Sequence, residues 1–219
     1  MSSAVPDRSR TPITPVPESA DERLGQVIRT RRHALGKTLV EVAAASELSH
    51  SFLSQLERGR ARPSMRSLFL IAEALGTTQQ SLLAEATPPS SPSTGLVDAA
   101  SSPVLTVQKG SARLLSHVPD GADVTEFINV PDTFEGYFAH GRHEFVYVVS
   151  GHLEVELRSP ADPATGAEHV ELHSLNARQS IGYPGTTQHR HRRVGTEDCV
   201  ILVVHSGPEN VAGGALHTH

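Results

Sequence analysis

The chain has 219 residues, a formal net charge of −5 and one cysteine. This length allows one large domain or two small ones, each able to bury its own core. A single cysteine excludes an internal disulfide, and Cys199 lies in an apolar run that favours packing over chemistry. No apolar run approaches the roughly 18 residues of a membrane span, and prolines replace a hydrophobic signal core in residues 1–20. We therefore expect a cytoplasmic protein with a disordered leader over residues 1–20.

Charge and composition divide the chain into two parts. Residues 23–66 carry nine Lys and Arg against three Glu, whereas residues 101–219 carry eight basic against fourteen acidic residues. Only the first part is therefore expected to bind an anionic partner. Residues 87–103 are rich in Pro and Ser, which favours a linker. We predict a helical domain over 21–86, a second domain over 104–206 and a flexible tail over 207–219.

The apolar period before the linker is helical. One face of a first helix carries Leu24, Val27, Ile28 and Leu35, and Gly36 ends that helix. Thr38 and Glu41 have the spacing of a capping box, which starts a second helix, and Ser49 can cap a third. Pro63 and Ser64 open a fourth helix that Gly76 ends, and a short fifth helix is expected near residues 81–84.

Residues 51–76, SFLSQLERGRARPSMRSLFLIAEALG, resemble the XRE/Cro-type helix-turn-helix domain from its recognition helix to its fourth helix. In that fold the third helix enters the major groove of DNA. The resemblance implies DNA contacts from Thr38, Ser49, His50, Ser51, Ser54, Gln55, Arg58, Arg60 and Arg62. Gln55 is suited to adenine and the arginines to phosphates, while Phe52, Leu53 and Leu56 are expected to face inward.

One position departs from the family pattern. The turn before the recognition helix has Glu47 where glycine is usual, and a left-handed conformation costs a residue with a side chain about 1 kcal/mol or more. We therefore expect a turn that differs in detail. The alternative reading of the whole domain is a helical dimerisation module with solvated arginines.

After the linker the pattern alternates with a period of two, which is typical of short strands in a sandwich or barrel. Such runs occupy residues 104–107, 112–115, 145–149, 153–157 and 200–204. Ser150-Gly151-His152 predicts a compact hairpin between two of them.

His140 and Glu144, followed much later by Tyr183-Pro184-Gly185 and His189, resemble the two cupin motifs over residues 104–206. The resemblance implies a cupin (double-stranded β-helix) barrel with a metal held by His140, Glu144 and His189. Phe138 replaces the usual first histidine and Arg193 the usual asparagine, so one ligand of four is missing. Two histidines and one carboxylate still suffice for an octahedral ion with open positions.

Two readings of this pocket remain open at the level of sequence. In one it binds a divalent Fe, Zn, Mn or Ni ion, with His191 as a better spare ligand than His143, because His191 shares a strand face with His189. In the other, Phe138 marks a barrel in which the metal has been given up, and His140 and His189 hydrogen-bond an organic ligand. Phe138, Tyr147 and His191 are expected to line the effector pocket.

The remaining charged and imidazole side chains are expected at the surface. The scattered histidines are His117, His152, His169, His173 and His205. Arg190, Arg192 and Arg193 bind an anionic effector at the barrel mouth or form a solvated strand edge.

The fold class is therefore α followed by all-β in two domains: a five-helix helix-turn-helix bundle and a cupin barrel. The favoured function is a homodimeric transcriptional regulator that binds a DNA operator and senses a small-molecule effector, not an enzyme. The alternative is a cupin-type non-haem iron oxygenase similar to hydroxypropylphosphonate epoxidase. A lysine of that enzyme's helical domain reaches its active site, and here Gly36 takes that position with Lys37 beside it. The polar recognition helix and its basic loop favour the regulator.

Overall fold

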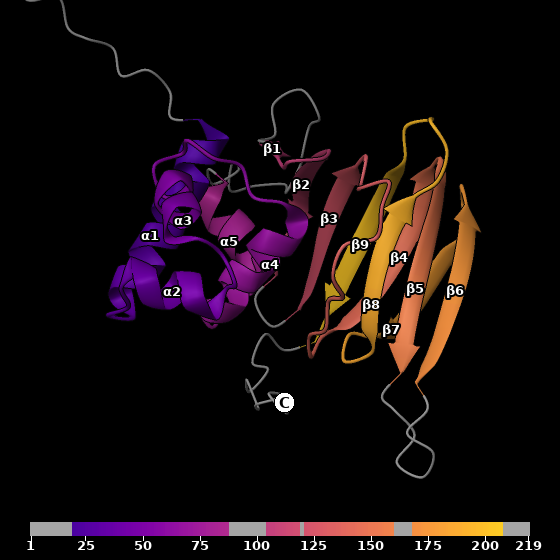
Figure 1. Ribbon diagram of the computed structural model, residues 1–219. Coiled ribbons are helices and arrows are strands. Elements are labelled where there is room, and N and C mark those ends of the chain that lie inside the picture. The colour runs from indigo at the N-terminus through magenta and orange to yellow at the C-terminus, as the bar shows by residue number, and fades with distance from the viewer. Residues whose placement is uncertain (1–18, 88–103, 119–120, 160–167, 208–219) are drawn as a thin grey trace, which may run out of the picture.

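The computed structural model describes residues 19–87, 104–118, 121–159 and 168–207. The predicted leader up to residue 18, the linker after residue 87 and the tail after residue 207 lie outside the described residues. Within the described ranges five helices precede nine strands, and the two groups lie side by side (Figure 1). No helix in the described ranges is long and apolar enough to cross a bilayer.

Each of the five helices begins at a Ser or Thr cap. The helices are α1 (Ala20–Ala34), α2 (Leu39–Ala45), α3 (His50–Leu56), α4 (Met65–Ala74) and α5 (Gln79–Ala86), and their caps are Ser19, Thr38, Ser49, Ser64 and Thr78. Every cap side chain accepts a hydrogen bond from a first-turn amide, which satisfies a donor that the helix itself leaves unpaired. Thr38 and Glu41 form the predicted capping box, and Ser19 and Glu22 form a second one. These capping hydrogen bonds explain why such short helices begin at well-defined residues.

The buried face of α1 is shorter than the sequence pattern predicted. Leu24 and Ile28 are buried, but Leu35 is half exposed. The prediction for Leu35 was wrong because α1 ends at Ala34, and Leu35 is the C-cap residue beyond the buried face. Leu53 and Leu56 of α3 are buried as expected, and Phe52 is partly buried.

The strands form two antiparallel sheets. The first has the order β1-β2-β3-β9-β4-β7 and the second the order β6-β5-β8. Their bounds are β1 (Leu105–Thr106), β2 (Ser111–Ser116), β3 (Ala122–Ile128), β4 (His143–Ser150), β5 (His152–Ser159), β6 (His169–Asn176), β7 (Ser180–Pro184), β8 (Gln188–Arg193) and β9 (Val200–Ser206). Val146, Val148, Leu153 and Val155 are fully buried in the core that both sheets share, and Cys199 packs there as predicted. The described strands thus face each other as two sheets and do not close into one continuous barrel.

The predicted hairpin at Ser150-Gly151-His152 is wrong in its pairing. Gly151 does make a tight turn with φ of +81°. However, β4 pairs with β7 and β9, while β5 pairs with β6 and β8. The turn therefore carries the chain from one sheet to the other, which places Glu144 and His189 on facing sheets.

The helices pack against the sheets through several side chains. Leu105 and Val107 join the core of the helical bundle, and the Gln108 amide donates to the Pro63 carbonyl at 3.2 Å. The Phe69 ring of α4 meets the Phe138 ring edge-on, with centroids 5.3 Å apart. The bundle consequently forms one wall of the space beside the sheets.

Candidate functional site

The first candidate surface is the outer face of α3. His50, Ser51 and Gln55 are exposed there, and Ser54 is partly buried. Ser49 accepts from the Phe52 amide, and the Thr38 hydroxyl belongs to the α2 capping box, so both hydroxyls lie at helix N-termini. This face offers short polar side chains at the surface of a rigid helix, as groove recognition requires.

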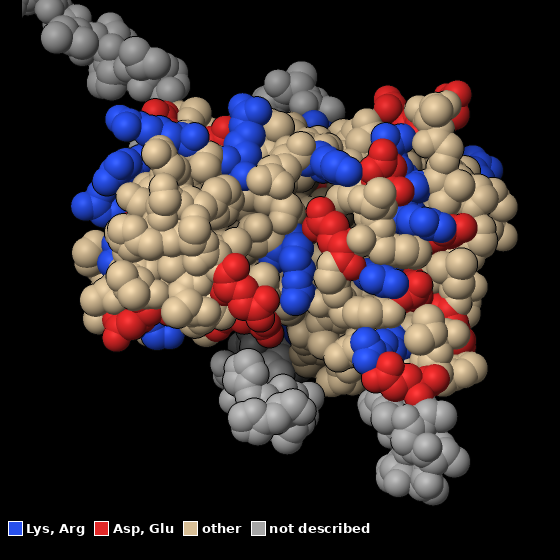
Figure 2. Space-filling view, in the orientation of Figure 1, with Lys and Arg blue, Asp and Glu red and all other residues tan. Residues whose placement is uncertain are grey.

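A basic loop follows α3. Arg58 and Arg60 are exposed, whereas the Arg62 guanidinium is paired with Asp21 at 3.0 Å. Lys and Arg side chains line the outer edge of the helical half in Figure 2, away from the sheets. Arg58 and Arg60 are thus available to an anion, and Arg62 must exchange its Asp21 partner to reach one.

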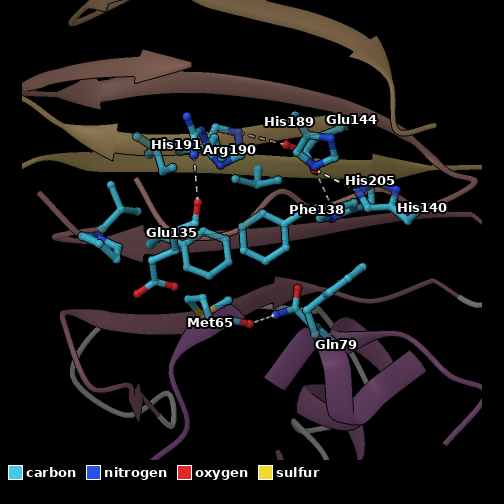
Figure 3. A pocket seen from close by; sticks show the side chains of 16 residues that line it. Met65, Gln79, Glu135, Phe138, His140, Glu144, His189, Arg190, His191 and His205 are labelled. Carbon is cyan, nitrogen blue, oxygen red and sulfur yellow. Dashed lines mark hydrogen bonds and ion pairs between the residues drawn. The ribbon is translucent and has the colours of Figure 1, made fainter. Parts of the chain in front are cut away.

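The second candidate site is a pocket between the helices and the sheets (Figure 3). Met65 and Phe69 of α4 and Gln79 of α5 form one wall. The opposite wall comes from the strands and from the segment between β3 and β4, and it carries a group of histidines around a carboxylate. Its lining is Phe127, Val130, Pro131, Glu135, Phe138, His140, Glu144, His189, Arg190, His191, Ile201, Val203 and His205. Histidines and a carboxylate gather at one end of the pocket, and mainly apolar side chains together with Gln79, Glu135 and Arg190 line the rest.

Glu144 is the centre of that polar end. It is 2% exposed, and its Oε2 atom lies 3.0 Å from His140 Nε2, 3.1 Å from His205 Nε2 and 3.3 Å from His189 Nε2. Its Oε1 atom accepts from the Tyr183 hydroxyl. Burial alone would raise the pKa of the Glu144 carboxyl, but the charge of His189 and the surrounding hydrogen bonds hold that pKa well below its usual value. Glu144 is therefore an anion that several imidazoles surround.

The other ring nitrogens of two histidines face carbonyl oxygens. His189 Nδ1 lies 2.8 Å from the Thr187 carbonyl and His140 Nδ1 lies 3.2 Å from the Arg142 carbonyl. A carbonyl only accepts, so Nδ1 carries a hydrogen in each ring. The charged ring also donates from Nε2 to Glu144, and the ring that has lost this second proton offers its Nε2 lone pair instead. Burial lowers the pKa of His140. Burial is also the largest effect on His189, but the Glu144 charge together with the hydrogen bonds to Glu144 and Thr187 outweighs it and raises the pKa of His189. Once both rings have lost the Nε2 proton, their lone pairs and the Glu144 carboxylate surround a position that suits a cation.

The residues present therefore fit a divalent metal ion. His140, Glu144 and His205 each offer one ligand atom, and these three atoms lie within 4.8 Å of one another. His189 contacts Glu144 without belonging to that compact group. Imidazole and carboxylate donors suit first-row ions such as Fe, Zn, Mn and Ni.

His205 corrects two predictions. It was expected at the surface, but it is 7% exposed and projects into the pocket from β9. His191, the predicted spare ligand, lies 3.3 Å from Glu144 Oε1, but its Nε2 also lies 2.8 Å from the Tyr183 hydroxyl, which itself donates to Glu144. His191 does not belong to the compact group of ligand atoms that His205 forms with His140 and Glu144, so His205 is the better extra ligand. The alternation of Ile201, Val203 and His205 on one strand face was the signal that could have found it.

Tyr147 does not belong to this pocket, contrary to the prediction. Alternate residues of β4 point to opposite faces, and Glu144 is buried while His143 and Phe145 are exposed. Tyr147 shares the outward face with His143 and Phe145 and is not among the lining residues. Phe138 does line the pocket and stacks on the His189 ring, with centroids 6.0 Å apart.

Three neighbours hold the polar end in place. A Cβ atom at Gly185 would lie 2.2 Å from both the Arg142 carbonyl and the His140 ring, so only glycine leaves room for that ring. Arg142 is buried, pairs with Asp123 and donates to the His205 carbonyl at 2.9 Å. Local sequence gives no signal for the pair of Arg142 and Asp123, because their contact depends on the pairing of distant strands.

The arginines of β8 are partly exposed and lie beside acidic side chains. Arg190 lines the pocket but pairs with Glu156, and Arg192 pairs with Glu154. Arg193 lies 3.9 Å from Asp132. Glu156 and Glu154 thus already balance the charges that a bound anion would need. Lys37 lies elsewhere: its ammonium group donates to the Ala74 carbonyl at the end of α4.

The helical part of the chain is similar in sequence to known helix-turn-helix proteins. Residues 23–86 match the family model described as a helix-turn-helix domain. The chain is 43% identical over 54 residues to the transcriptional regulator ClgR of Mycobacterium tuberculosis, which covers 25% of this chain and 48% of that protein. It is 42% identical over 52 residues to the HTH-type transcriptional regulator y4dJ of Sinorhizobium fredii, which covers 24% of this chain and 68% of that protein. The chain spans about half the length of the first curated relatives that it matches.

The similarity to solved structures covers both the helical half and the β-sheet half of the chain. A helix-turn-helix family transcriptional regulator from Vibrio cholerae superposes with a TM-score of 0.59 at 19% identity, over 86% of this chain and 97% of that one. This identity shows a shared fold only. Hydroxypropylphosphonic acid epoxidase from S. wedmorenis aligns with a TM-score of 0.41 at 17% identity, over 86% of this chain and 99% of that one, a score too low to support an argument.

Proposed function

Because this chain belongs to the helix-turn-helix family of transcriptional regulators, we propose that it binds an operator sequence in double-stranded DNA and responds to an effector in its β-sheet half. The observation that carries the first part is the capped helix α3, whose exposed face presents His50, Ser51 and Gln55 beside the exposed Arg60. A groove-reading helix needs this combination of short polar side chains and nearby positive charge.

In this role one set of side chains contacts base edges and the other contacts phosphates. Gln55 pairs with a base edge, for which adenine offers the matching donor and acceptor, while His50, Ser51 and Ser54 contact neighbouring positions. Arg58, Arg60 and Arg62 contact phosphates, with Thr38 and Ser49 doing so at helix N-termini. Phosphate contacts supply affinity and register, and base contacts supply sequence choice.

The β-sheet half acts as a cupin sensor domain in this proposal. Its two facing antiparallel sheets, with His140, Glu144 and His189 between them, support that reading. A divalent ion would be held by these three residues together with His205, and it would supply a Lewis-acidic centre for an effector. Phe138 and the apolar part of the pocket would contact the effector's carbon skeleton.

The proposed active form is a homodimer. Two recognition helices dock in successive major grooves only when their half-sites lie about 34 Å apart, one helical turn of DNA. An effector that favours one dimer spacing over another then shifts the population that binds the operator.

The deciding experiment is selection of operator DNA. Purified protein is incubated with sheared DNA from its own source at about 0.15 M salt, where non-specific phosphate binding is weak, and the retained fragments are sequenced. We expect a discrete palindromic site. Retention no better than background would overturn the DNA-binding role, and the next step would be iron(II) loading and a search for oxygen-consuming substrates.

A pair of variants then separates base contacts from phosphate contacts. Gln55→Ala should cost about 1–3 kcal/mol at one base position and relax the choice there, whereas Arg60→Ala should weaken all sequences alike and lower the salt slope by about one. Equal behaviour of both variants on matched and mismatched operators would refute this division of roles.

A further inference from the structure

One hydrogen bond joins the helical bundle directly to the histidine–carboxylate cluster. Gln80 of α5 is 4% exposed, and its side-chain amide nitrogen lies 3.1 Å from His205 Nδ1. The other nitrogen of the same ring, Nε2, lies 3.1 Å from Glu144 Oε2. The His205 ring thus bridges a residue of the helical half and the central carboxylate of the pocket.

Gln80 differs in chemistry from the partners of the other histidines. His140 and His189 face backbone carbonyls, which accept only, so the hydrogen of each neutral ring is fixed on Nδ1. A side-chain amide has a donor end and an acceptor end, and rotation about its last bond exchanges them. The tautomer of His205 therefore depends on the orientation of the Gln80 amide.

The two orientations correspond to two states of the cluster. In the observed one, Gln80 Nε2 donates to His205 Nδ1, so the hydrogen of the neutral ring is on Nε2 and donates to Glu144. A cation needs the Nε2 lone pair instead, which puts the hydrogen on Nδ1. The Gln80 carbonyl oxygen must then turn toward His205 to accept it.

We propose that Gln80 is a positioning residue that sets the His205 tautomer, so that a divalent cation bound by His140, Glu144 and His205 reverses the Gln80 amide inside the helical bundle. This inference rests on the metal-binding part of the proposed function. Helix α5 packs against both α1 and α4, and α4 directly follows the basic loop of the DNA-binding surface. The cation would therefore change a hydrogen bond of α5, which packs against the helix that follows the basic loop.

Three variants test the role of the amide. Gln80→Met keeps the length of the side chain but removes the hydrogen bond, and we expect Zn²⁺ affinity to fall about 10-fold or more, as is usual for partners that orient a ligand. Gln80→Glu offers only an acceptor and should keep at least the affinity of the unchanged chain. Arg66→Met serves as the matched control, because Arg66 joins the same two halves through the Tyr137 carbonyl without touching the cluster.

Zn²⁺ affinity is measured on the full chain by competition with a chromophoric chelator. Imidazole ¹⁵N spectra then report the His205 tautomer, which should move its hydrogen from Nε2 to Nδ1 when Zn²⁺ is added. A purely structural role of Gln80 predicts that Gln80→Met and Gln80→Glu weaken binding alike. That result, or an unchanged His205 tautomer on Zn²⁺ addition, overturns the inference.

The same measurements distinguish a failure of the proposed metal site from a failure of the Gln80 role. An unchanged chain that takes up no Zn²⁺ refutes the proposed metal site and the inference together. Zn²⁺ binding that is equal in the unchanged chain, Gln80→Met and Arg66→Met leaves the metal site standing and refutes only the role of Gln80. The ratio of operator affinities with and without Zn²⁺ should shrink toward one in Gln80→Met and persist in Arg66→Met.

Discussion

Two buried carboxylates show how differently the helical half and the β-sheet half use charge. Glu57, just after α3, is 6% exposed, and both of its oxygens accept from the Arg32 guanidinium, at 2.6 and 2.8 Å. Glu144 is 2% exposed, and its partners are imidazoles and a phenol. A guanidinium stays charged in a protein, whereas an imidazole can give up a proton or a lone pair.

The Arg32–Glu57 pair is therefore a fixed link, whereas the contacts of Glu144 with its histidines are adjustable. The Arg32–Glu57 pair ties α1 to the end of α3, and both carboxylate oxygens of Glu57 are used in it. The histidines around Glu144 can take a proton, donate one or bind a cation at nearly the same geometry. The burial of a charged group therefore does not by itself identify a functional site; the chemistry of its partners does.

The largest expected effect tests the fixed link. Arg32→Met leaves the Glu57 carboxylate buried without its partner, so the free energy of unfolding should fall by about 3–5 kcal/mol. Urea unfolding measures this change. Arg31→Met is the matched control, because Arg31 pairs with Glu85 at the partly exposed surface and such pairs contribute about 0–1 kcal/mol. Equal losses in both variants would mean that the buried pair is not a special link.

A smaller and conditional effect is expected at the adjustable carboxylate. Glu144→Gln keeps the shape of the side chain and removes its charge, so without metal the free energy of unfolding should fall by only about 1–3 kcal/mol, the scale of charged hydrogen bonds. With Zn²⁺ at about 100 times the dissociation constant, the unchanged chain should gain about 2.7 kcal/mol, and Glu144→Gln should lose that gain. Thermal unfolding with and without Zn²⁺ measures both quantities.

If Glu144 alone of the two carboxylates binds the cation, only variants at the cluster should lose the stabilisation by Zn²⁺. Arg31→Met should keep it in full, and so should Glu154→Gln, whose carboxylate pairs with Arg192 and is not among the pocket-lining residues. A Zn²⁺ response that survives Glu144→Gln would place the cation elsewhere and remove the distinction between the two carboxylates.

Local signals made the helical half predictable. The hydroxyl of Thr38 and the carboxylate of Glu41 are three residues apart, so their capping box is fixed by adjacent sequence alone. The Ser19–Glu22 box has the same spacing and was missed only because Ser19 was assigned to the leader. The Arg32–Glu57 pair joins two helices and cannot be inferred from either helix separately.

The pocket was less predictable because long-range strand pairing builds it. The two histidines and the glutamate of the cupin resemblance do come together around one carboxylate. His205 joins them only because β9 pairs with β4 in the register that sets Glu144 opposite His205. Gln80 reaches the cluster from a helix 125 residues away in sequence. Neither contact leaves a trace in local sequence, apart from the alternation along β9.

The turn before α3 holds Glu47 in the left-handed conformation that favours glycine. Glu47 has φ of +55°, so the chain adopts this conformation despite the side chain. Its amide donates to the Ala44 carbonyl, and the Leu48 amide donates to the Ala43 carbonyl at 2.9 Å, the Schellman pattern that ends a helix. The amides of Gly36 and Lys37 end α1 in the same way, with φ of +64° at Gly36.

The smallest predicted effect has the opposite sign to the others. Glu47→Gly removes the cost of about 1–2 kcal/mol that a side chain pays in this conformation, offset by the greater freedom of glycine in the unfolded chain. The free energy of unfolding should therefore rise by about 0.5–1 kcal/mol, as measured by urea unfolding. Gly36→Ala is the mirror control, because a Cβ atom there meets nothing within 4 Å and only the conformational cost remains, so stability should fall by a similar amount. A loss of stability in Glu47→Gly would show that the exposed Glu47 side chain contributes more than its backbone strain costs.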